Sequence, residues 1–259
     1  MIGAPLASWY ADHGRHDLPW RATRDRWAVL VSEVMLHQTQ VPRVRSAWPA
    51  FMARFPTPEA MAGSPPGAVI AAWGRLGYPR RARRLHDAAS FVAEQGWPDD
   101  LCVLPGVGRY TAGAVAAQVD DADVPAVDVN VRRALERVEG AHLSPRALDV
   151  AMTAIGAPLR GRDRLLALMD VGAEVCRPRS PRCDECPLRT GCATRGERAG
   201  ERRRSQAPYE GSFRQRRGTV LAMVRTQGEV SAVGLDAGAL ASLVADGLAV
   251  VEAGTARLP

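Results

Sequence analysis

Four of the five cysteines lie in one short segment, and four thiolates so close together form a metal-binding pattern. They are Cys176, Cys183, Cys186 and Cys192, a C-x6-C-x2-C-x5-C run. Four soft sulfur ligands from one compact loop suit either a tetrahedral zinc ion or a [4Fe–4S] cluster. Zinc sites more often contain two C-x2-C pairs, and only one is present here. The spacing therefore favours a [4Fe–4S] cofactor. The fifth cysteine, Cys102, adjoins an apolar stretch, and we interpret it as a small buried hydrophobe.

A second segment has the composition of a phosphate-binding turn. Gly106, Val107 and Gly108 follow Leu-Pro and precede a predicted small-residue helix from about residue 111 to 118. Two glycines separated by one residue let the backbone turn tightly and present N–H groups at a helix N-terminus, where anions bind. A lone G-x-G motif is weak evidence. This pattern is more specific than a lone G-x-G motif, because Arg-Tyr-Thr-Ala-Gly follows it directly and Asp128 follows about twenty residues later.

The basic residues restrict the chemistry further. All 34 are arginine, so no side-chain amine can form a Schiff base, and lysine-dependent mechanisms are excluded. Against 28 acidic residues the net charge is +6, which by itself is weak evidence for a polyanionic partner. The arginines cluster at 80–84, 202–204 and 214–217. These clusters are either solvated faces or sites for phosphates.

The elements that must position these residues are mostly helical. Apolar residues recur at spacings of three and four over 26–54, and helical patterns continue over 67–75, 80–95, 129–138, 145–157 and 161–175. Strand-like alternation is hard to find before residue 215, so the first 200 residues are predicted to be all-α. Residues 194–212 are polar and basic and predict a linker. Beyond it, helices at 213–225 and 237–245 and a hairpin within 248–258 suggest a small winged-helix-like appendage.

Composition places the chain among folded proteins. With 259 residues, 46% hydrophobic and 24% charged, it can bury a core. No apolar run approaches the length of a membrane span, and the N-terminus lacks the layout of a signal peptide. We therefore expect a cytoplasmic protein with no membrane partner.

Taken in order, these segments resemble the helix-hairpin-helix DNA glycosylases, and most closely the MutY-type adenine glycosylases. The resemblance covers about Leu18 to Cys192. It is carried by LPWR (18–21), SEVMLHQTQV (32–41), RFPTPEAM (54–61), LGYPRRARRLH (76–86), LPGVGRYTAGAV (104–115), VDVNVRR (127–133), ALMDVGAEVC (167–176) and the cysteine run. It implies a cluster-bearing domain at 1–23 and 131–193 and a six-helix barrel with the helix-hairpin-helix at 24–130. The linker at 194–212 and the appendage at 213–259 follow from composition and pattern and lie beyond the segment that carries the resemblance.

The resemblance implies hydrolysis of the bond between a base and its deoxyribose after the nucleotide is flipped out of the duplex. Glu33 matches the family's acid/base position, where burial among apolar neighbours would raise its pKa. Asp128 matches the carboxylate that stays ionised and faces C1′ of the sugar, and it also suits a helix N-cap. Asn130 would orient Asp128. Tyr110 stands where bifunctional relatives carry a lysine nucleophile, so the enzyme should be monofunctional and leave an intact abasic site.

The same resemblance implies the DNA contacts. The backbone N–H groups of residues 106–108 would bind a phosphate. Gln38 and Tyr78 resemble residues inserted into the base stack, with Leu76 near them. Trp20, Arg21 and Leu36 match positions that line the base pocket. The expected partner is double-stranded DNA with a mismatched or damaged base pair, bound by a monomer at the nucleoid.

Several departures from the family pattern keep alternatives open for the base that is excised. The family's Asp-Gly-Asn is Asp128-Val129-Asn130, its double Gln is His37-Gln38, and a polar residue that contacts adenine in relatives is replaced by Leu166. The tail is also too short for the usual domain that recognises 8-oxoguanine. The leading hypothesis is excision of adenine opposite 8-oxoguanine or guanine. The alternatives are a thymine/uracil glycosylase acting on mismatches with guanine and, in another class, a non-catalytic DNA-binding module.

Overall fold

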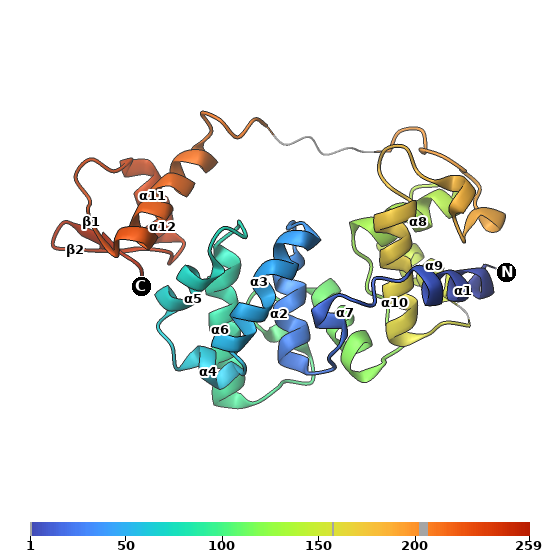
Figure 1. The fold of residues 1–259 in the computed structure, drawn as a ribbon, viewed down its shortest axis with the longest axis horizontal. Helices are drawn as coiled ribbons and strands as arrows, with labels where there is room; N and C mark the ends of the chain where they lie inside the picture. Colours follow the sequence, from blue (N-terminus) through green and yellow to red (C-terminus); the bar gives the residue numbers. More distant parts are fainter. Residues whose placement is uncertain (1, 157, 202–206) are drawn as a thin grey trace. The chain divides into compact units, whose positions relative to one another are not determined.

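The computed structural model describes residues 2–156, 158–201 and 207–259, and its regular structure is mainly helical (Figure 1). The α-helices are α1 (Gly3–His13), α2 (Arg26–Leu36), α3 (Val41–Arg54), α4 (Pro58–Ala62), α5 (Pro66–Trp73), α6 (Arg80–Gln95), α7 (Arg109–Asp120), α8 (Val129–Glu139), α9 (Pro145–Ile155), α10 (Gly161–Asp170), α11 (Phe213–Gln227) and α12 (Ala237–Ala245). Short helical turns are η1 (Pro19–Arg21), η2 (Leu101–Val103), η3 (Val171–Val175), η4 (Cys183–Glu185) and η5 (Arg189–Gly191). Three strands follow α11: β1 (Glu229–Ser231), β2 (Val250–Glu252) and β3 (Thr255–Arg257).

Contacts divide the chain into two units, and each unit contains two separate stretches of sequence. The first unit is Met1–Glu33 with Val107–Arg203, and the second is Val34–Gly106 with Arg204–Pro259. The division falls within α2. The domain boundaries that the resemblance implies, at residues 24 and 130, stay a prediction.

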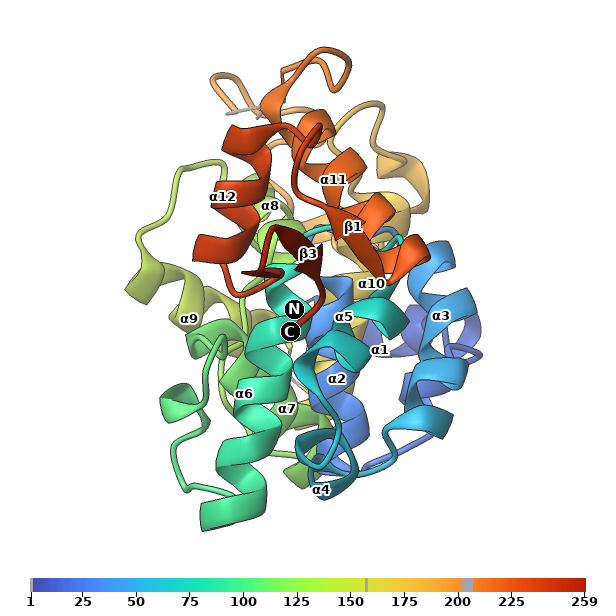
Figure 2. The ribbon, with the colours of Figure 1, turned by 90° about the vertical axis from the view of Figure 1, so that its left-hand side faces the viewer.

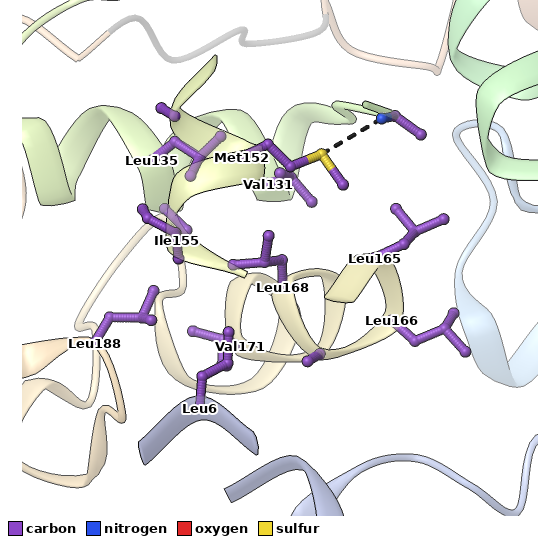
Figure 3. Packing of buried hydrophobic residues seen from close by; sticks show 14 of the residues in the cluster. Leu6, Val131, Leu135, Met152, Ile155, Leu165, Leu166, Leu168, Val171 and Leu188 are labelled. Carbon is purple, nitrogen blue, oxygen red and sulfur yellow. Dashed lines mark hydrogen bonds between the residues drawn. The ribbon is translucent and has the colours of Figure 1, made fainter. Parts of the chain in front are cut away.

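The core of the first unit surrounds α10. Leucines at 165, 166 and 168 are buried there together with apolar side chains of α1, α8 and α9, among them Leu6, Val131 and Met152 (Figure 3). Helix α8 buries residues 131, 134, 135 and 138, a spacing of three and four that presents one apolar stripe. The helix begins at the N-cap Asp128 and ends at Gly140, a left-handed C-cap. This capping matters for the site because Asp128 is also the predicted second catalytic carboxylate.

The second unit combines barrel helices with the C-terminal domain, residues 207–259. Helix α6 packs on α4 and α5, while α11 packs on α12. The three strands form an antiparallel sheet in the order β1-β3-β2, with Ala256 of β3 opposite Val230 on one side and Val251 on the other. Helices and a terminal hairpin give the domain the predicted winged-helix-like character (Figure 2). Its chain end lies beside α5, since Gly67 N–H donates to the carbonyl of Pro259 at 2.6 Å.

The structure corrects several expectations from sequence. The segment 26–54, predicted to be helical, contains two helices, because Gln38 adopts a left-handed φ of 54° in a short turn between α2 and α3. Cys102 is exposed in η2 rather than buried, because in this short turn Leu101 faces inward while Cys102 and Val103 face outward. Strand β1 was not expected.

Other expectations are confirmed. Within the described residues, every strand lies after residue 228, in agreement with an all-α first part. The arginine cluster at 202–204 and the centre of the predicted linker lie outside the described residues. None of the helices in the described ranges has the length and apolar composition needed to cross a bilayer.

Candidate active site

Glu33 is a buried carboxyl with two side-chain partners. Helix α2 carries it among apolar residues, and it is only 2% exposed. Its Oε2 accepts a hydrogen bond from the Tyr110 hydroxyl at 3.0 Å, and its Oε1 accepts one from Gln118 Nε2 at 2.7 Å. Burial raises the pKa of Glu33, the two hydrogen bonds oppose that shift, and the charge of Asp128 adds to it. The residue therefore holds a proton more firmly than an exposed glutamate does.

Gln118 is a site residue that the motif reading missed. It is 1% exposed and lies eight residues after Tyr110 on α7, slightly more than two helical turns, so both side chains occupy the same face. The available signal was an amide side chain in a helix of small residues. Tyr110 itself is half-buried, and the desolvation of its hydroxyl together with the charges of Glu33 and Asp128 puts its pKa well above the ordinary value of 10. It is therefore a neutral hydrogen-bond donor.

Asp128 has a different environment from Glu33. It is half-buried at the N-cap of α8, where Oδ1 accepts hydrogen bonds from the N–H groups of Asn130 and Val131 at 2.9 and 2.7 Å. Its Oδ2 accepts from Asn130 Nδ2 at 2.8 Å. The helix N-terminus and these three donors place positive partial charge around the Asp128 carboxyl. Asp128 lies near enough to Glu33 for its charge to raise the pKa of Glu33, so the two predicted carboxylates share one region.

A chain of hydrogen bonds runs from Asp128 to the cysteine loop. Arg133 Nη2 donates to the Asn130 side-chain oxygen at 3.0 Å, and Arg133 Nε donates to the carbonyl of Cys176 at 2.7 Å. The same Nη2 donates to the carbonyl of Gly172 at 2.5 Å. Arg133 therefore fixes Asn130, which in turn holds Asp128, against the segment that begins the cysteine run.

The three residues predicted to line the base pocket, and Leu166, lie in different environments. Trp20 is buried in η1. Both terminal nitrogens of Arg21 donate to Asp170 at 2.7 Å, so its guanidinium is held in an ion pair rather than presented toward an open site. Leu36 ends α2 in the second unit and is half-buried. Leu166 is part of the core cluster of the first unit.

The four cysteines of the run line a single pocket, together with Arg137 and Leu188. Burial raises the pKa of Cys176, and raises that of Cys186 to about 11, so these thiolates need positive charge nearby to form. Arg137, 2% exposed, donates to the Cys176 sulfur at 3.5 Å and pairs with Glu201 at 2.9 Å. Among the described residues, no three His, Cys, Asp or Glu side chains converge as ligands of a single metal ion.

The predicted phosphate-binding turn has the backbone that its glycines suggest. Gly106 has a φ of 82°, and a Cβ there would lie 2.9 Å from the Cβ of Arg84. Gly108 is the N-cap of α7, while Val107 between them is buried. Residue 106 must therefore be glycine for two reasons, backbone conformation and space.

Gln38 and Tyr78 both adopt left-handed backbone conformations, with φ of 54° and 48°. One guanidinium holds both loops. Arg81 donates to the carbonyls of Val34 and Met35 at the end of α2, to Thr39 Oγ1 at 2.9 Å and to the Gly77 carbonyl at 3.0 Å. Its Cζ also lies 5.4 Å from the centre of the Tyr78 ring. Leu76 is buried, and its carbonyl accepts a hydrogen bond from Thr39 at 3.1 Å.

The fold and this site define a helix-hairpin-helix base excision repair protein. The family model described as HhH-GPD superfamily base excision DNA repair protein matches residues 31–154. A solved structure of a thermostable thymine-DNA glycosylase is similar with a TM-score of 0.66 and 27% identity, over 74% of this chain and 94% of that one. An endonuclease III–DNA complex shares the fold at a TM-score of 0.63 and 22% identity, over 73% of this chain and 91% of that one.

Within this class, closer relatives are adenine DNA glycosylases. That of Mycolicibacterium smegmatis is 46% identical over 233 residues, covering 85% of this chain and 79% of that protein. The Homo sapiens protein is 38% identical over 211 residues, covering 73% of this chain and 38% of that protein. The chain belongs to the MutY-type adenine DNA glycosylase family of the helix-hairpin-helix superfamily.

Proposed function

We propose that the protein is a monofunctional adenine DNA glycosylase of base excision repair. It would flip out adenine mispaired with 8-oxoguanine or guanine and hydrolyse the bond between the base and its sugar. The observation that carries this proposal is the contrast between two carboxyls in one region. Glu33 is buried with its pKa raised, whereas Asp128 is capped by three hydrogen-bond donors.

In the proposed reaction, protonated Glu33 gives its proton to the adenine as the C1′–N9 bond breaks and the bonding electron pair leaves with the base. Ionised Asp128 stabilises the positive charge that develops on the sugar. A water molecule then adds to C1′, and its released proton returns Glu33 to the acid form. Tyr110 and Gln118 hold the Glu33 carboxyl in place through both oxygens.

Monofunctional chemistry follows from the nucleophiles that the chain lacks. Tyr110 occupies the position of the lysine of bifunctional relatives, and the chain contains no lysine. No side-chain amine can therefore attack C1′ and lead to strand cleavage. The product is an intact abasic site.

Cys176, Cys183, Cys186 and Cys192 would hold a [4Fe–4S] cluster. The donor set fits, because the four cysteines line one pocket and supply the four thiolate ligands that such a cluster takes. The cluster would supply positive charge beside Cys176 and Cys186, the two cysteines whose pKa burial raises. Arg133 and Arg137 attach this loop to the helix that begins at Asp128.

The DNA contacts are proposed on the same family pattern. Residues 106–108 would bind a phosphate through backbone N–H groups, and Gln38, Leu76 and Tyr78 would enter or support the gap in the base stack. Trp20, Arg21 and Leu36 would border the base. The partner is double-stranded DNA with a mismatched base pair, bound by a monomer at the nucleoid of the cytoplasm.

A glycosylase assay on matched duplexes tests the proposal. The panel contains adenine opposite 8-oxoguanine, adenine opposite guanine, and thymine or uracil opposite guanine. We expect excision of adenine, and loss of excision in Glu33→Gln and Asp128→Asn with DNA binding retained. Excision of thymine or uracil alone would favour the second candidate, a thymine/uracil mismatch glycosylase. Leu166, which is buried, and the similarity to a thymine-DNA glycosylase support that candidate. Binding without any excision would indicate a non-catalytic module.

A further inference from the structure

The loop between α5 and α6 is held in an unusual backbone conformation. Three of its residues have left-handed φ values: Gly74 at 59°, Gly77 at 82° and Tyr78 at 48°. The glycines adopt such values readily, but a tyrosine does not. The Tyr78 side chain is also 46% exposed, so its burial does not account for the left-handed backbone conformation. Contacts from surrounding segments must therefore maintain this loop.

The C-terminal domain contacts α5 at both ends. At the start of the helix, Gly67 N–H has no acceptor within the helix and donates to the carbonyl of Pro259 at 2.6 Å. At its end, the carbonyl of Gly74, the C-cap residue, accepts a hydrogen bond from Arg225 Nη1 of α11 at 2.6 Å. The C-terminal domain thus caps both ends of α5, the helix that precedes the Tyr78 loop. Figure 2 shows the end of the chain beside α5.

The close approach at Gly67 requires glycine. A Cβ at this position would clash with the Pro259 oxygen and would lie 2.8 Å from the Leu258 Cβ. On the other side of the loop, Asp246 lies 3.4 Å from the Arg80 guanidinium and the Gly247 carbonyl 3.5 Å from that of Arg83. The domain therefore contacts the segments before and after the loop.

The composition of α12 argues against a role in reading DNA. This helix, Ala237–Ala245, contains no basic residue, and acidic residues flank it on both sides, Asp236 and Asp246. A helix that enters a DNA groove needs basic or polar side chains for phosphates and base edges. The charges near α12 are instead used within the protein, since Asp246 also pairs with Arg217 at 2.6 Å.

We propose that the C-terminal domain braces α5 and thereby holds the Gly74–Pro79 loop, with Tyr78 in its left-handed conformation, ready to enter the base stack. Arg225 is the positioning residue of this brace. The role in nucleotide extrusion rests on the proposed function, whereas the ordering of the loop does not depend on it.

Amide hydrogen exchange of the full-length protein tests the brace. Arg225→Met should speed exchange in the peptide that covers residues 74–78 about tenfold, which is the effect of losing one charge-assisted hydrogen bond. Arg225→Lys should restore part of the protection. Arg214→Met is the matched control, because Arg214 lies on the same helix, is exposed, and donates to the carbonyl of Ala207 rather than to the barrel. In this variant the peptide that covers residues 74–78 should exchange as in the wild type.

A second variant and a DNA readout complete the test. Gly67→Ala should raise exchange in the same peptide by displacing the chain end. In a Glu33→Gln background, which prevents excision, 2-aminopurine beside the target adenine reports unstacking on binding. Arg225→Met should lower that fluorescence rise, and Arg214→Met should not. Unchanged exchange in both Arg225→Met and Gly67→Ala overturns the brace, and altered exchange with an unchanged fluorescence rise overturns its part in extrusion. A wild-type protein that excises no base refutes the proposed function instead.

Discussion

Glu33 and Asp170 are buried carboxyls of the same unit with opposite protonation behaviour. Glu33 is 2% exposed and Asp170 is fully buried. Burial raises the pKa of Glu33, whose hydrogen-bond donors are an amide and a phenol. Burial acts in the same direction on Asp170, but the hydrogen bonds and charge of Arg21, together with Arg15, lower its pKa below the ordinary value. The charge of the hydrogen-bond partners, rather than the depth of burial, therefore decides which of these two carboxyls keeps a proton to donate.

Removing the acid should have the largest effect. Glu33→Gln keeps the size of the side chain and a donor for hydrogen bonds but has no proton to transfer to the base. We expect single-turnover excision to fall by about 10³-fold, the usual contribution of a general acid, with binding to mismatched DNA nearly unchanged. Excision at close to the wild-type rate would remove Glu33 from its proposed role.

Removing the ionised carboxyl should act on stability instead. Asp170→Asn leaves Arg21 buried without its counter-charge, and breaking such a pair costs about 3–5 kcal/mol. Denaturant unfolding measures this loss. Asp120→Asn is the control, since Asp120 pairs with Arg26 at the surface at 3.2 Å and exposed pairs contribute at most about 1 kcal/mol. Equal losses in both variants would contradict the contrast.

The contributions of Glu33 and Asp170 to the stability of the folded protein should also change with pH in opposite directions. Because the folded-state pKa of Glu33 is raised, its contribution is complete below the pKa of the unfolded chain and is lost as pH rises through the folded-state value. Glu33→Gln should therefore gain stability relative to the wild type with rising pH. Asp170 contributes above its unfolded-chain pKa, and that contribution is lost as pH falls through the lowered value. Melting temperatures of both variants from about pH 2 to pH 8 cover both trends, because the loss of the Asp170 contribution lies below about pH 4.

The smallest effect concerns the partner of Glu33. The Gln118 amide stabilises the charged form, so Gln118→Leu should raise the pKa of Glu33 further. The pH at which excision declines should move upward, because the acid form persists to higher pH. A pH–rate profile measured under single-turnover conditions checks this direction. A downward movement would mean that the amide does not act on the ionised form.

Motifs with fixed local spacing carried most of what the sequence could predict. Short-range patterns place Gly106 and Gly108 before the first turn of α7 and Asp128 at the N-cap of α8, and the structure has them there. Gln118 could not be found this way, because its role depends on α7 packing against α2, a contact between residues 85 positions apart. Cys102 was wrongly assigned as buried because apolar neighbours in sequence do not fix the direction of a side chain in a short turn. The pairing of Arg21 with Asp170, 149 positions away, could not be predicted from the sequence for the same reason.

Arg81 links two loops that are about forty residues apart in sequence. Its guanidinium bonds to the loop of Gln38 through Thr39 and to the loop of Tyr78 through Gly77. The backbone conformations of Gln38 and Tyr78 are therefore coupled, because a change in either loop alters the hydrogen bonds that Arg81 makes to both. Substitutions at positions 38 and 78 should then combine non-additively, with the coupling disappearing once Arg81 itself is replaced.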